Sequence, residues 1–501
     1  MADHGPHNRR IFALPALFAL VTTSVFLIVM RWRAGAAGFP LDDAWIHQTY
    51  ARNLALHGEF SFVLGQPSAG STAPLWTLLL APGYWLGLAP FVWAWALGAL
   101  SLIGAALAAA YLARGLFPEE EHPTIPVLAA LVVAGEWHLV WSAASGMETA
   151  LFAAGVLALL GVAVRWARKL PTPRQAFLGG VGIGALTLTR PEGVLLSGIL
   201  GLALLISLWR RWSVLVKYGL IVGAGLLLVV LPYVALNLHL SGAPFPNTFY
   251  AKQQEYGILY TLPLLTRLFR LWPTLLAGPL VMLILALPWA LDDPRRAPGQ
   301  WLPLVWVVGT WVLYAWRLPV TYQHGRYLIP IIPPLLVYGT GGLRRFWRKA
   351  RSGWRWIVTR AWAAATALVL ISFLWLGADI FATDVAIING EMVDVAQWIN
   401  THTAPDTHIA AHDIGALGYF AQRPLLDLAG LVSPEVIPFI RDEAQLLAWM
   451  EARQAEYLVT FPSWYPTLVA DPRLELVYQT DTALTRAHGE DNMAIYRCRW
   501  P

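Results

Sequence analysis

The hydrophobic positions of this chain form long continuous runs rather than the alternating pattern of half-buried strands. From residue 11 to residue 380, apolar stretches follow one another, and stretches of about 20 residues are long enough to cross the roughly 30 Å hydrocarbon core of a bilayer. We therefore expect a polytopic α-helical membrane domain over residues 1–384. The pattern predicts eleven spans, at 11–30, 91–113, 125–142, 148–166, 175–189, 193–209, 214–236, 272–291, 301–317, 327–343 and 357–380.

The pattern changes after residue 384. Short apolar segments with strand-like composition occur in "THIAAHD", "EYLVTF", "LELVYQT" and "MAIYRCR". Helical periodicity occurs in "EMVDVAQWINTH" and "DEAQLLAWMEARQ". Residues 385–501 are therefore predicted to form a small α/β domain outside the membrane.

The composition agrees with a membrane protein. Of 501 residues, 57% are hydrophobic and 13% are charged, whereas soluble domains carry about 25% charged residues. The net charge of +5 does not call for a nucleic-acid partner, because membrane proteins use Lys and Arg to set topology. The single cysteine, Cys498, excludes an intrachain disulfide. Residues 11–30 exceed a usual signal-peptide core and no clear cleavage site follows, so we expect no cleaved signal peptide.

The basic residues predict the orientation of the chain. With the N-terminus in the cytoplasm, the inside segments hold 19 Lys and Arg and the outside loops before residue 381 hold nine, as the positive-inside rule expects. An odd number of spans then places the C-terminal domain outside, and residues 31–90 form the first external loop. The predicted location is the cytoplasmic (plasma) membrane, with multiple spans. The inside residues are Arg9, Arg10, Arg114, Arg165, Arg168, Lys169, Arg174, Arg210, Arg211, Lys217, Arg295, Arg296 and seven more in 344–360.

Two adjacent carboxylates, Asp42 and Asp43, stand in the first external loop, in "FPLDDAWIHQTYARNLALHGEFSF". Either aspartate can cap a helix that begins near Ala44, and His47 is one turn beyond Asp43. That helix carries Ile46, Tyr50 and Leu54 on one face, which suits the membrane surface. One aspartate suffices as a cap, so the second is a candidate for chemistry. The alternative is that one caps and the other is only solvated.

Further charged candidates fall on the same predicted side of the membrane. Five of them have a plainer alternative. Lys252 could be a snorkelling lysine and Arg326 a membrane-edge arginine, Arg190 and Glu192 could neutralise each other in a turn, and Glu148 could be a carboxylate favoured at a helix start. Their shared location nevertheless predicts one external cavity at the membrane surface. The candidates are Arg52, Glu148 in "SGMETA", Arg190 and Glu192 in "TRPEG", Lys252 after "PFPNTFYA", and His324, Arg326 and Tyr327 in "TYQHGRYLIP".

The loop sequence "DDAWIHQTYARNLALHGEFSF…GQPSAGSTAPLWTLLLAP" resembles the first-loop signature of the GT-C superfamily of membrane glycosyltransferases. It is most similar to bacterial members related to protein mannosyltransferases, the aminoarabinose transferase of lipid A and the terminal arabinofuranosyltransferases of actinobacteria. The resemblance extends over nearly the whole chain through "SGMETALF", "TRPEG", "PFPNTFYAK", "HGRYLIP" and "HDIGALGYF…LLDLAGLVSP". It implies a GT-C-like bundle and transfer of a sugar from a polyprenyl-phosphate donor.

The resemblance also implies that the acidic pair of the first loop supplies the catalytic base, without telling whether Asp42 or Asp43 is the base. Such a reaction needs a carboxylate to accept the proton of the acceptor hydroxyl and cations to stabilise the leaving phosphate, and Lys252 and Arg326 are the candidates for the second task. Direct attack would invert the anomeric carbon. The acceptor could be a protein, a lipid or a cell-wall glycan. We expect no cofactor and see no cluster that reads as a metal site, although the aspartate pair could hold a divalent cation.

The tail contains polar residues whose role stays open. His412 and Asp413 precede "IGALGYF", and Asp427 precedes "LAGLVSP". We expect these residues to serve turn formation and packing, with the binding of an acceptor sugar as the alternative. Two other functions compete with transfer: a transporter or flippase of a lipid-linked sugar, and a non-catalytic sugar-binding or scaffold protein.

Overall fold

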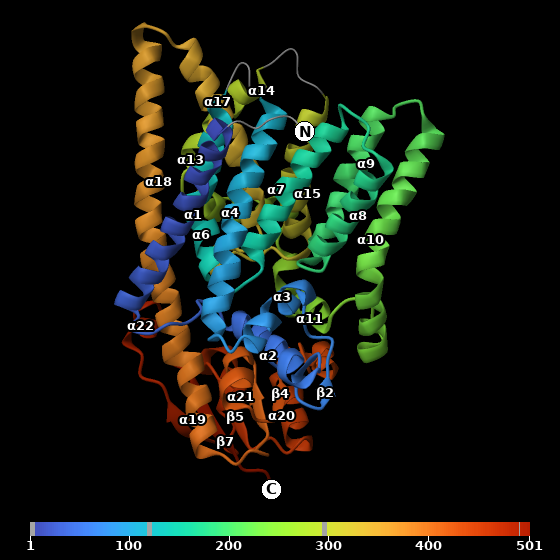
Figure 1. The fold of residues 1–501 in the computed structure, drawn as a ribbon. Coiled ribbons are helices and arrows are strands. Elements are labelled where there is room, and N and C mark those ends of the chain that lie inside the picture. Colours follow the sequence, from blue (N-terminus) through green and yellow to red (C-terminus); the bar gives the residue numbers. More distant parts are fainter. Residues whose placement is uncertain (1–5, 118–122, 293–297, 490) are drawn as a thin grey trace.

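The computed structural model describes residues 6–117, 123–292, 298–489 and 491–501, with the side chains described from residue 13 onward. A bundle of long helices makes up one end of the molecule, and a small sheet with its covering helices makes up the other (Figure 1). Three helices lie between them: α2 (Asp42–His57), α3 (Pro74–Trp85) and α11 (Asn247–Glu255). Arg295 and Arg296 lie outside the described residues, as do the side chains of Arg9 and Arg10.

Each predicted apolar span is helical in the structure, because these segments have few polar groups and satisfy their backbone internally. Five helices in the described part of the chain are long and apolar enough to cross a membrane, as in a multi-pass membrane protein. The helices over the predicted spans are α1 (Pro6–Arg33), α4 (Pro90–Leu116), α7 (Thr149–Trp166), α8 (Pro173–Thr187), α9 (Leu195–Ser207), α10 (Trp212–Ser241), α15 (Leu302–Arg317), α17 (Ile332–Lys349) and α18 (Gly353–Ile388), with α5 (Ile125–Ala134) and α6 (Trp137–Ala144) over 125–142.

Two predicted spans are not straight helices. The axes of α5 and α6 differ by 54°, and Glu136 caps α6 at the break by accepting a hydrogen bond from the backbone N–H of Leu139.

The segment 272–291 is bent by 110° between α12 (Leu264–Leu276) and the helical stretch Leu280–Leu291. Gly278, with φ +141°, and Pro279 separate the two halves, a conformation that suits glycine followed by a residue with no N–H. The span predicted at 272–291 is therefore not a single straight helix. Counting each bent pair as one span raises the number to seven, so the predicted eleven is not confirmed.

The longest helix connects the bundle to the tail. α18 continues through a π-helical turn (Asn389–Val393) into α19 (Asp394–His402). Glu391 in this turn is fully buried and accepts hydrogen bonds from Thr485 Oγ1 at 2.6 Å and from Asn492 Nδ2 and the Met493 backbone N–H, both at 2.8 Å. A buried carboxylate with its oxygens satisfied fixes the tail to the end of α18.

The tail contains a five-stranded mixed sheet in the order β4-β3-β5-β7-β6. The four predicted strands are confirmed as β3 (Ile409–Ala411), β5 (Tyr457–Thr460), β6 (Leu474–Gln479) and β7 (Ala494–Cys498), whereas β4 (Leu425–Asp427) was not predicted. β4, β3 and β5 run parallel, and β7 runs antiparallel to β5 and β6. The two helices predicted in the tail are confirmed as α19 and α20 (Glu443–Ala452).

Candidate active site

The helix that carries the acidic pair is held inside the protein. α2 begins at Asp42 with Leu41 as its N-cap, and no side chain caps it, so the predicted capping role is wrong. Ile46 and Tyr50 are buried, because the α3 segment and the tail cover α2. The predicted membrane-surface role of this face is therefore also wrong. Both aspartates stand in the first turn, where the helix dipole favours negative charge.

Asp42 joins α2 to the tail. The backbone N–H groups of Gly415 and Ala416 donate to Asp42 Oδ2 and Oδ1 at 2.6 and 2.8 Å. A Cβ at position 415 would lie 2.1 Å from the backbone oxygen of Asp42, so only glycine permits this approach. Asp42 thus caps a helical turn that lies more than 370 residues further along the chain.

Replacing Asp42 by Asn should loosen the tail rather than abolish chemistry. The amide keeps the shape but offers one oxygen in place of two, which leaves a buried N–H unsatisfied at about 1–3 kcal/mol. Thermal unfolding of the purified protein should therefore show a lower melting temperature near pH 5. An unchanged melting temperature would show that the two hydrogen bonds do not hold the tail.

The same variant should flatten the dependence of stability on pH. Burial and the negative charge of Asp413 raise the pKa of Asp42 to about 8, whereas an unfolded aspartate titrates near about 3.9. Between these values the folded state binds the extra proton, so the contribution of this carboxyl group to stability is full below the lower value and declines as the pH rises. Melting curves from pH 5 to 8 should slope downward less steeply in Asp42→Asn than in wild type.

Asp43 points away from this contact, toward two cations. Its Oδ2 accepts a hydrogen bond from Arg326 Nη2 and lies 3.7 Å from Lys252 Nζ. Both cations also donate to the hydroxyl of Tyr327, Lys252 at 3.0 Å and Arg326 at 3.1 Å. Burial alone would raise the pKa of Asp43, but Arg326 and Lys252 overcome burial and hold it well below the usual range. Nη1 of Arg326 is buried without a hydrogen-bond partner among the described residues.

A strained turn places Arg326 beside Asp43. Gln323, His324 and Gly325 have φ values of +52°, +58° and +67°, and the left-handed region costs about 1–3 kcal/mol for residues other than glycine. His324 Nε2 lies 2.8 Å from Asp384 Oδ2 on α18, and Trp141 Nε1 donates to the same oxygen at 2.9 Å. His324 thus holds the turn to two helices of the bundle.

The loop at residues 68–73 and α11 place Lys252. Thr248 Oγ1 donates to the Gly70 carbonyl at 2.6 Å, and the Asn247 backbone N–H donates to the Ala69 carbonyl at 2.8 Å. The Gly70 N–H in turn donates to the Tyr50 hydroxyl of α2 at 3.1 Å. Lys252 is one turn beyond Thr248, so the first loop fixes the helix that presents this lysine to Asp43.

A second charged cluster lies deeper in the bundle. Arg190 Nε donates to Glu192 Oε1 at 2.7 Å, and Arg190 Nη1 lies 3.4 Å from Glu148 Oε1. Glu148 is also 3.6 Å from His47 Nε2. The plainer alternative for Arg190 and Glu192, mutual pairing, is therefore confirmed. These side chains are buried, and the pairing offsets the energy of placing charge there.

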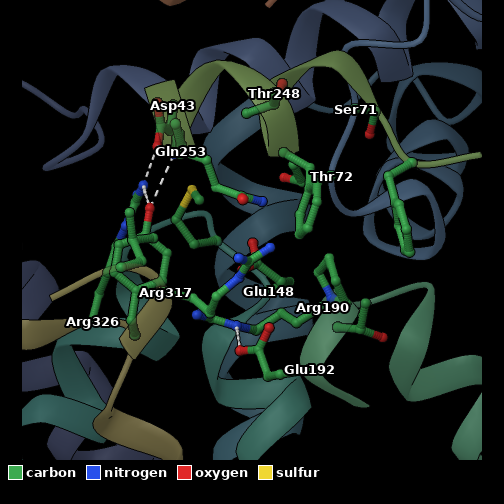
Figure 2. A pocket seen from close by; sticks show the side chains of 18 of the residues that line it. Asp43, Ser71, Thr72, Glu148, Arg190, Glu192, Thr248, Gln253, Arg317 and Arg326 are labelled. Atoms are coloured by element: carbon green, nitrogen blue, oxygen red, sulfur yellow. Dashed lines mark hydrogen bonds and ion pairs between the residues drawn. The ribbon is translucent and has the colours of Figure 1, made fainter. Parts of the chain in front are cut away.

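Both clusters line one cavity of about 340 Å³. Figure 2 shows Asp43 with Arg326 on one side and Arg190 with Glu192 on another. Four cations and three carboxylates line the cavity, an excess of one positive charge. The remaining wall is largely apolar, with Ile46, Met147, Val194, Leu195, Phe245, Phe249, Leu313 and Leu318.

A second cavity, of about 720 Å³, lies between the bundle and the tail. It shares five lining residues with the first: Asp43, Ile46, Lys252, Arg326 and Leu431. Its other walls are more polar and include Asp42, Glu255, His412 and Asp413. Asp43 and its two cations therefore stand where the two cavities meet.

The structure brings together most of the candidates from the sequence. Asp43, His47, Glu148, Arg190, Glu192, Lys252, Arg326 and Tyr327 line the first cavity, and Asp42 lines the second. Two candidates are not among the lining residues of either cavity. Arg52 donates to the Tyr419 carbonyl at 2.7 Å and joins α2 to the tail, and His324 holds the turn described above.

Sequence reasoning missed several polar residues of the two walls. Ser71, Thr72, Thr189, Thr248, Gln253 and Arg317 line the first cavity, and Glu255, Arg441, Glu443, Trp464 and Tyr465 line the second. Ser71 and Thr72 lie in the Gly/Ser-rich loop and could have been suspected from it. The others carry no local signal, because they come from helices and loops that only the fold brings together.

The donor set does not favour a metal at the aspartate pair. Asp42 is taken up by two backbone N–H groups and Asp43 by two cations, and cations against a carboxylate oppose a further cation. Among the described residues, no group of three or more His, Cys, Asp or Glu side chains could hold a metal ion.

Comparison with known proteins adds a curated relative and a domain family. A family model described as a domain of unknown function, DUF8728, matches residues 384–496. A terminal beta-(1->2)-arabinofuranosyltransferase of Mycobacterium tuberculosis is 27% identical over 407 residues, which cover 71% of this chain and 60% of the relative. The chain thus spans less than two thirds of the length of that protein.

Solved structures resemble the chain over nearly its whole length. ArnT from Cupriavidus metallidurans, bound to undecaprenyl phosphate, matches with a TM-score of 0.63 and 16% identity over 96% of this chain and 97% of ArnT. The oligosaccharyltransferase AglB of Archaeoglobus fulgidus, in complex with an inhibitory peptide and a dolichol-phosphate, matches with a TM-score of 0.55 and 12% identity over 89% of this chain and 69% of AglB. The chain therefore shares the fold of ArnT and AglB.

Proposed function

We propose that this protein is a glycosyltransferase that moves a sugar from a polyprenyl-phosphate donor to an acceptor hydroxyl at the extracytoplasmic face of the membrane. One observation carries the proposal: Asp43, Arg326 and Lys252 stand at the junction of an apolar and a polar cavity. The curated relative is an arabinofuranosyltransferase, and ArnT and AglB were solved with polyprenyl phosphates. These three proteins support a polyprenyl-phosphate sugar as the class of donor. They do not identify which sugar is transferred.

The first cavity suits the donor. Its apolar wall can contact the isoprenoid chain and its excess positive charge can bind a phosphate. Arg326, with its unpartnered Nη1, and Lys252 would hold the phosphate. The second cavity would admit the acceptor from the side of the tail.

The proposed step needs only these residues. An acceptor hydroxyl in the second cavity gives its proton to Asp43 while its oxygen bonds to the anomeric carbon. The bond from that carbon to the phosphate oxygen breaks, and the polyprenyl phosphate leaves with the electron pair, stabilised by Arg326 and Lys252. One displacement inverts the anomeric configuration.

Donor binding would also make Asp43 a better base. In the empty site two cations hold its pKa well below the usual range, which makes the carboxylate weakly basic. A phosphate between Arg326 and Lys252 would neutralise part of that charge and raise the pKa of Asp43, because nearby negative charge disfavours ionisation. Proton abstraction would thus be favoured only when the donor is in place.

The first experiment is mass spectrometry of the lipids that co-purify with the protein, followed by transfer assays with the sugar found. We expect a polyprenyl phosphate or its glycoside, and a product whose anomeric configuration, read by NMR, is opposite to that of the donor. Movement of a labelled lipid-linked sugar across vesicles without any glycosidic product would contradict the proposal and favour a transporter. Asp43, Lys252 and Arg326 line the cavity between the bundle and the tail, where an external acceptor could reach them, and this position favours transfer over transport.

A further inference from the structure

The tail carries a second group of polar and aromatic side chains, to which the proposed reaction assigns no role. They follow the carboxyl ends of the three parallel strands: His412 and Asp413 after β3, Asp427 at the end of β4, and Trp464 and Tyr465 after β5. In open sheets with parallel strands, ligands bind in the crevice outside the carboxyl ends of the strands. Here His412, Asp413, Trp464 and Tyr465 line the second cavity.

The aromatic part of this edge is open. The Trp464 side chain is 43% exposed although it lines a cavity. The His412 and Phe461 rings, with centroids 5.1 and 4.9 Å away, hold the indole in place. An indole fixed by its neighbours with a free face offers a flat apolar platform at little loss of side-chain entropy.

Polar groups surround this platform. His412 Nδ1 lies 2.6 Å from the Tyr465 hydroxyl, and His412 Nε2 lies 3.5 Å from Glu255 Oε1 of α11. The contact between His412 and Glu255 joins the tail to the helix that carries Lys252. Burial raises the pKa of Asp413 to about 6, so this carboxyl group mainly accepts hydrogen bonds at neutral pH and gains a donor as the pH falls toward 6.

The charge of the cavity limits the class of ligand. Its lining holds five carboxyl groups, of Asp42, Asp43, Glu255, Asp413 and Glu443, and three permanent cations, of Lys252, Arg326 and Arg441. Burial raises the pKa of Asp42 and of Asp413, so these two carboxyl groups carry less than a full negative charge near neutral pH. Two of the three cations already contact Asp43. The other basic side chains of the lining are Arg441 and His412, and His412 already contacts Glu255. The remaining surface therefore gives an anionic ligand few free partners and offers many hydrogen-bonding groups to a ligand rich in hydroxyl groups.

We propose that the carboxyl edge of the tail sheet is the acceptor subsite and that it binds a neutral carbohydrate, with the ring of one sugar unit on Trp464 and its hydroxyls on His412, Asp413 and Glu255. This rests on the proposed function in placing the acceptor beside Asp43. It assigns a role to the segment matched by the domain of unknown function, and it makes the acceptor a glycan rather than a peptide or a lipid.

The test is direct binding, which needs no turnover. The full-length protein in lipid nanodiscs is mixed with neutral pentose- and hexose-based oligosaccharides, and saturation-transfer NMR reports contact. We expect binding by wild type and by Trp464→Phe, and at least about tenfold weaker binding by Trp464→Ala, as for loss of a buried aromatic contact. Leu476→Ala on β6, which removes a similarly exposed apolar side chain at the far edge of the sheet, should bind like wild type. Equal binding by all variants, or binding of a Ser/Thr peptide or a phospholipid in place of the sugars, would overturn the proposal.

Turnover then separates this inference from the proposed function. Trp464→Ala should raise the KM for the acceptor at least about tenfold, while Leu476→Ala should keep the KM of wild type. If the oligosaccharides bind at Trp464 but no transfer occurs, the proposed function fails and the binding site stands. If transfer occurs and the KM of Trp464→Ala equals that of wild type, the subsite fails and the function stands. A melting temperature equal to that of wild type shows that the variant is folded.

Discussion

Asp43→Asn should lower kcat by roughly 10²–10⁴-fold, the contribution of a positioned general base. The amide keeps the shape of the side chain but cannot accept the proton. It also removes the negative charge that competes for Arg326 and Lys252, so a polyprenyl phosphate should bind to the variant at least as tightly as to wild type. A loss of turnover with donor binding retained is the signature of a catalytic role, since a merely structural defect would weaken both.

Asp42→Asn is the matched control for this variant. It makes the same chemical change one residue away, on a carboxyl group that accepts hydrogen bonds from two backbone N–H groups of the tail. We expect Asp42→Asn to retain turnover within about tenfold of wild type. The Asp42 side chain positions the tail, and the variant leaves Asp43, the proposed base, unchanged. Full activity of Asp43→Asn together with inactivity of Asp42→Asn would reverse the assignment of the base.

Arg326→Gln should lower kcat by roughly 10²–10³-fold, as removal of one preorganised donor to a developing negative charge does. Arg326 is buried, lines both cavities, contacts Asp43 and has one buried nitrogen without a hydrogen-bond partner among the described residues. Arg326→Lys should recover only part of the rate, because an ammonium group is a point charge and lacks the second planar nitrogen. Steady-state kinetics on purified enzyme with the donor found by mass spectrometry measures both effects.

Arg317→Gln provides the control for charge alone. Arg317 lines the same cavity but makes no ion pair with a carboxylate among the described residues. We expect a decrease of less than about tenfold, because an exposed charge is screened by solvent and salt. If Arg317→Gln and Arg326→Gln lower kcat equally, the phosphate is stabilised by the summed positive charge of the cavity and not by a specific contact with Arg326.

The sequence was enough to predict the helical character of the apolar runs, four of the five strands of the tail sheet, and the convergence of the charged residues. The apolar runs have few other solutions in a bilayer, and Asp43, Glu148, Arg190, Lys252 and Arg326 do converge on one cavity. It was not enough to predict the bend at Gly278, because an apolar segment has the same composition whether it is straight or folded back on itself.

The separation of the two aspartates could not be predicted either. Asp42 and Asp43 are adjacent in sequence, but consecutive residues of a helix point in directions about 100° apart, and what each meets depends on distant segments. The partners of Asp42 are at 415 and 416, and those of Asp43 are at 252 and 326. The role of His324 depends on Asp384, a residue with no local signal on a long apolar helix.

The most direct test of the account is a structure of the full-length protein in nanodiscs with a polyprenyl phosphate bound. We expect the phosphate within hydrogen-bond distance of Arg326 Nη1 and Lys252 Nζ, the isoprenoid chain along Phe245, Phe249 and Leu195, and the Asp43 carboxylate turned toward the cavity beneath the tail. A phosphate bound at the opposite end of the bundle, or one that leaves the contacts of Arg326 and Lys252 with Asp43 undisturbed, would contradict the account.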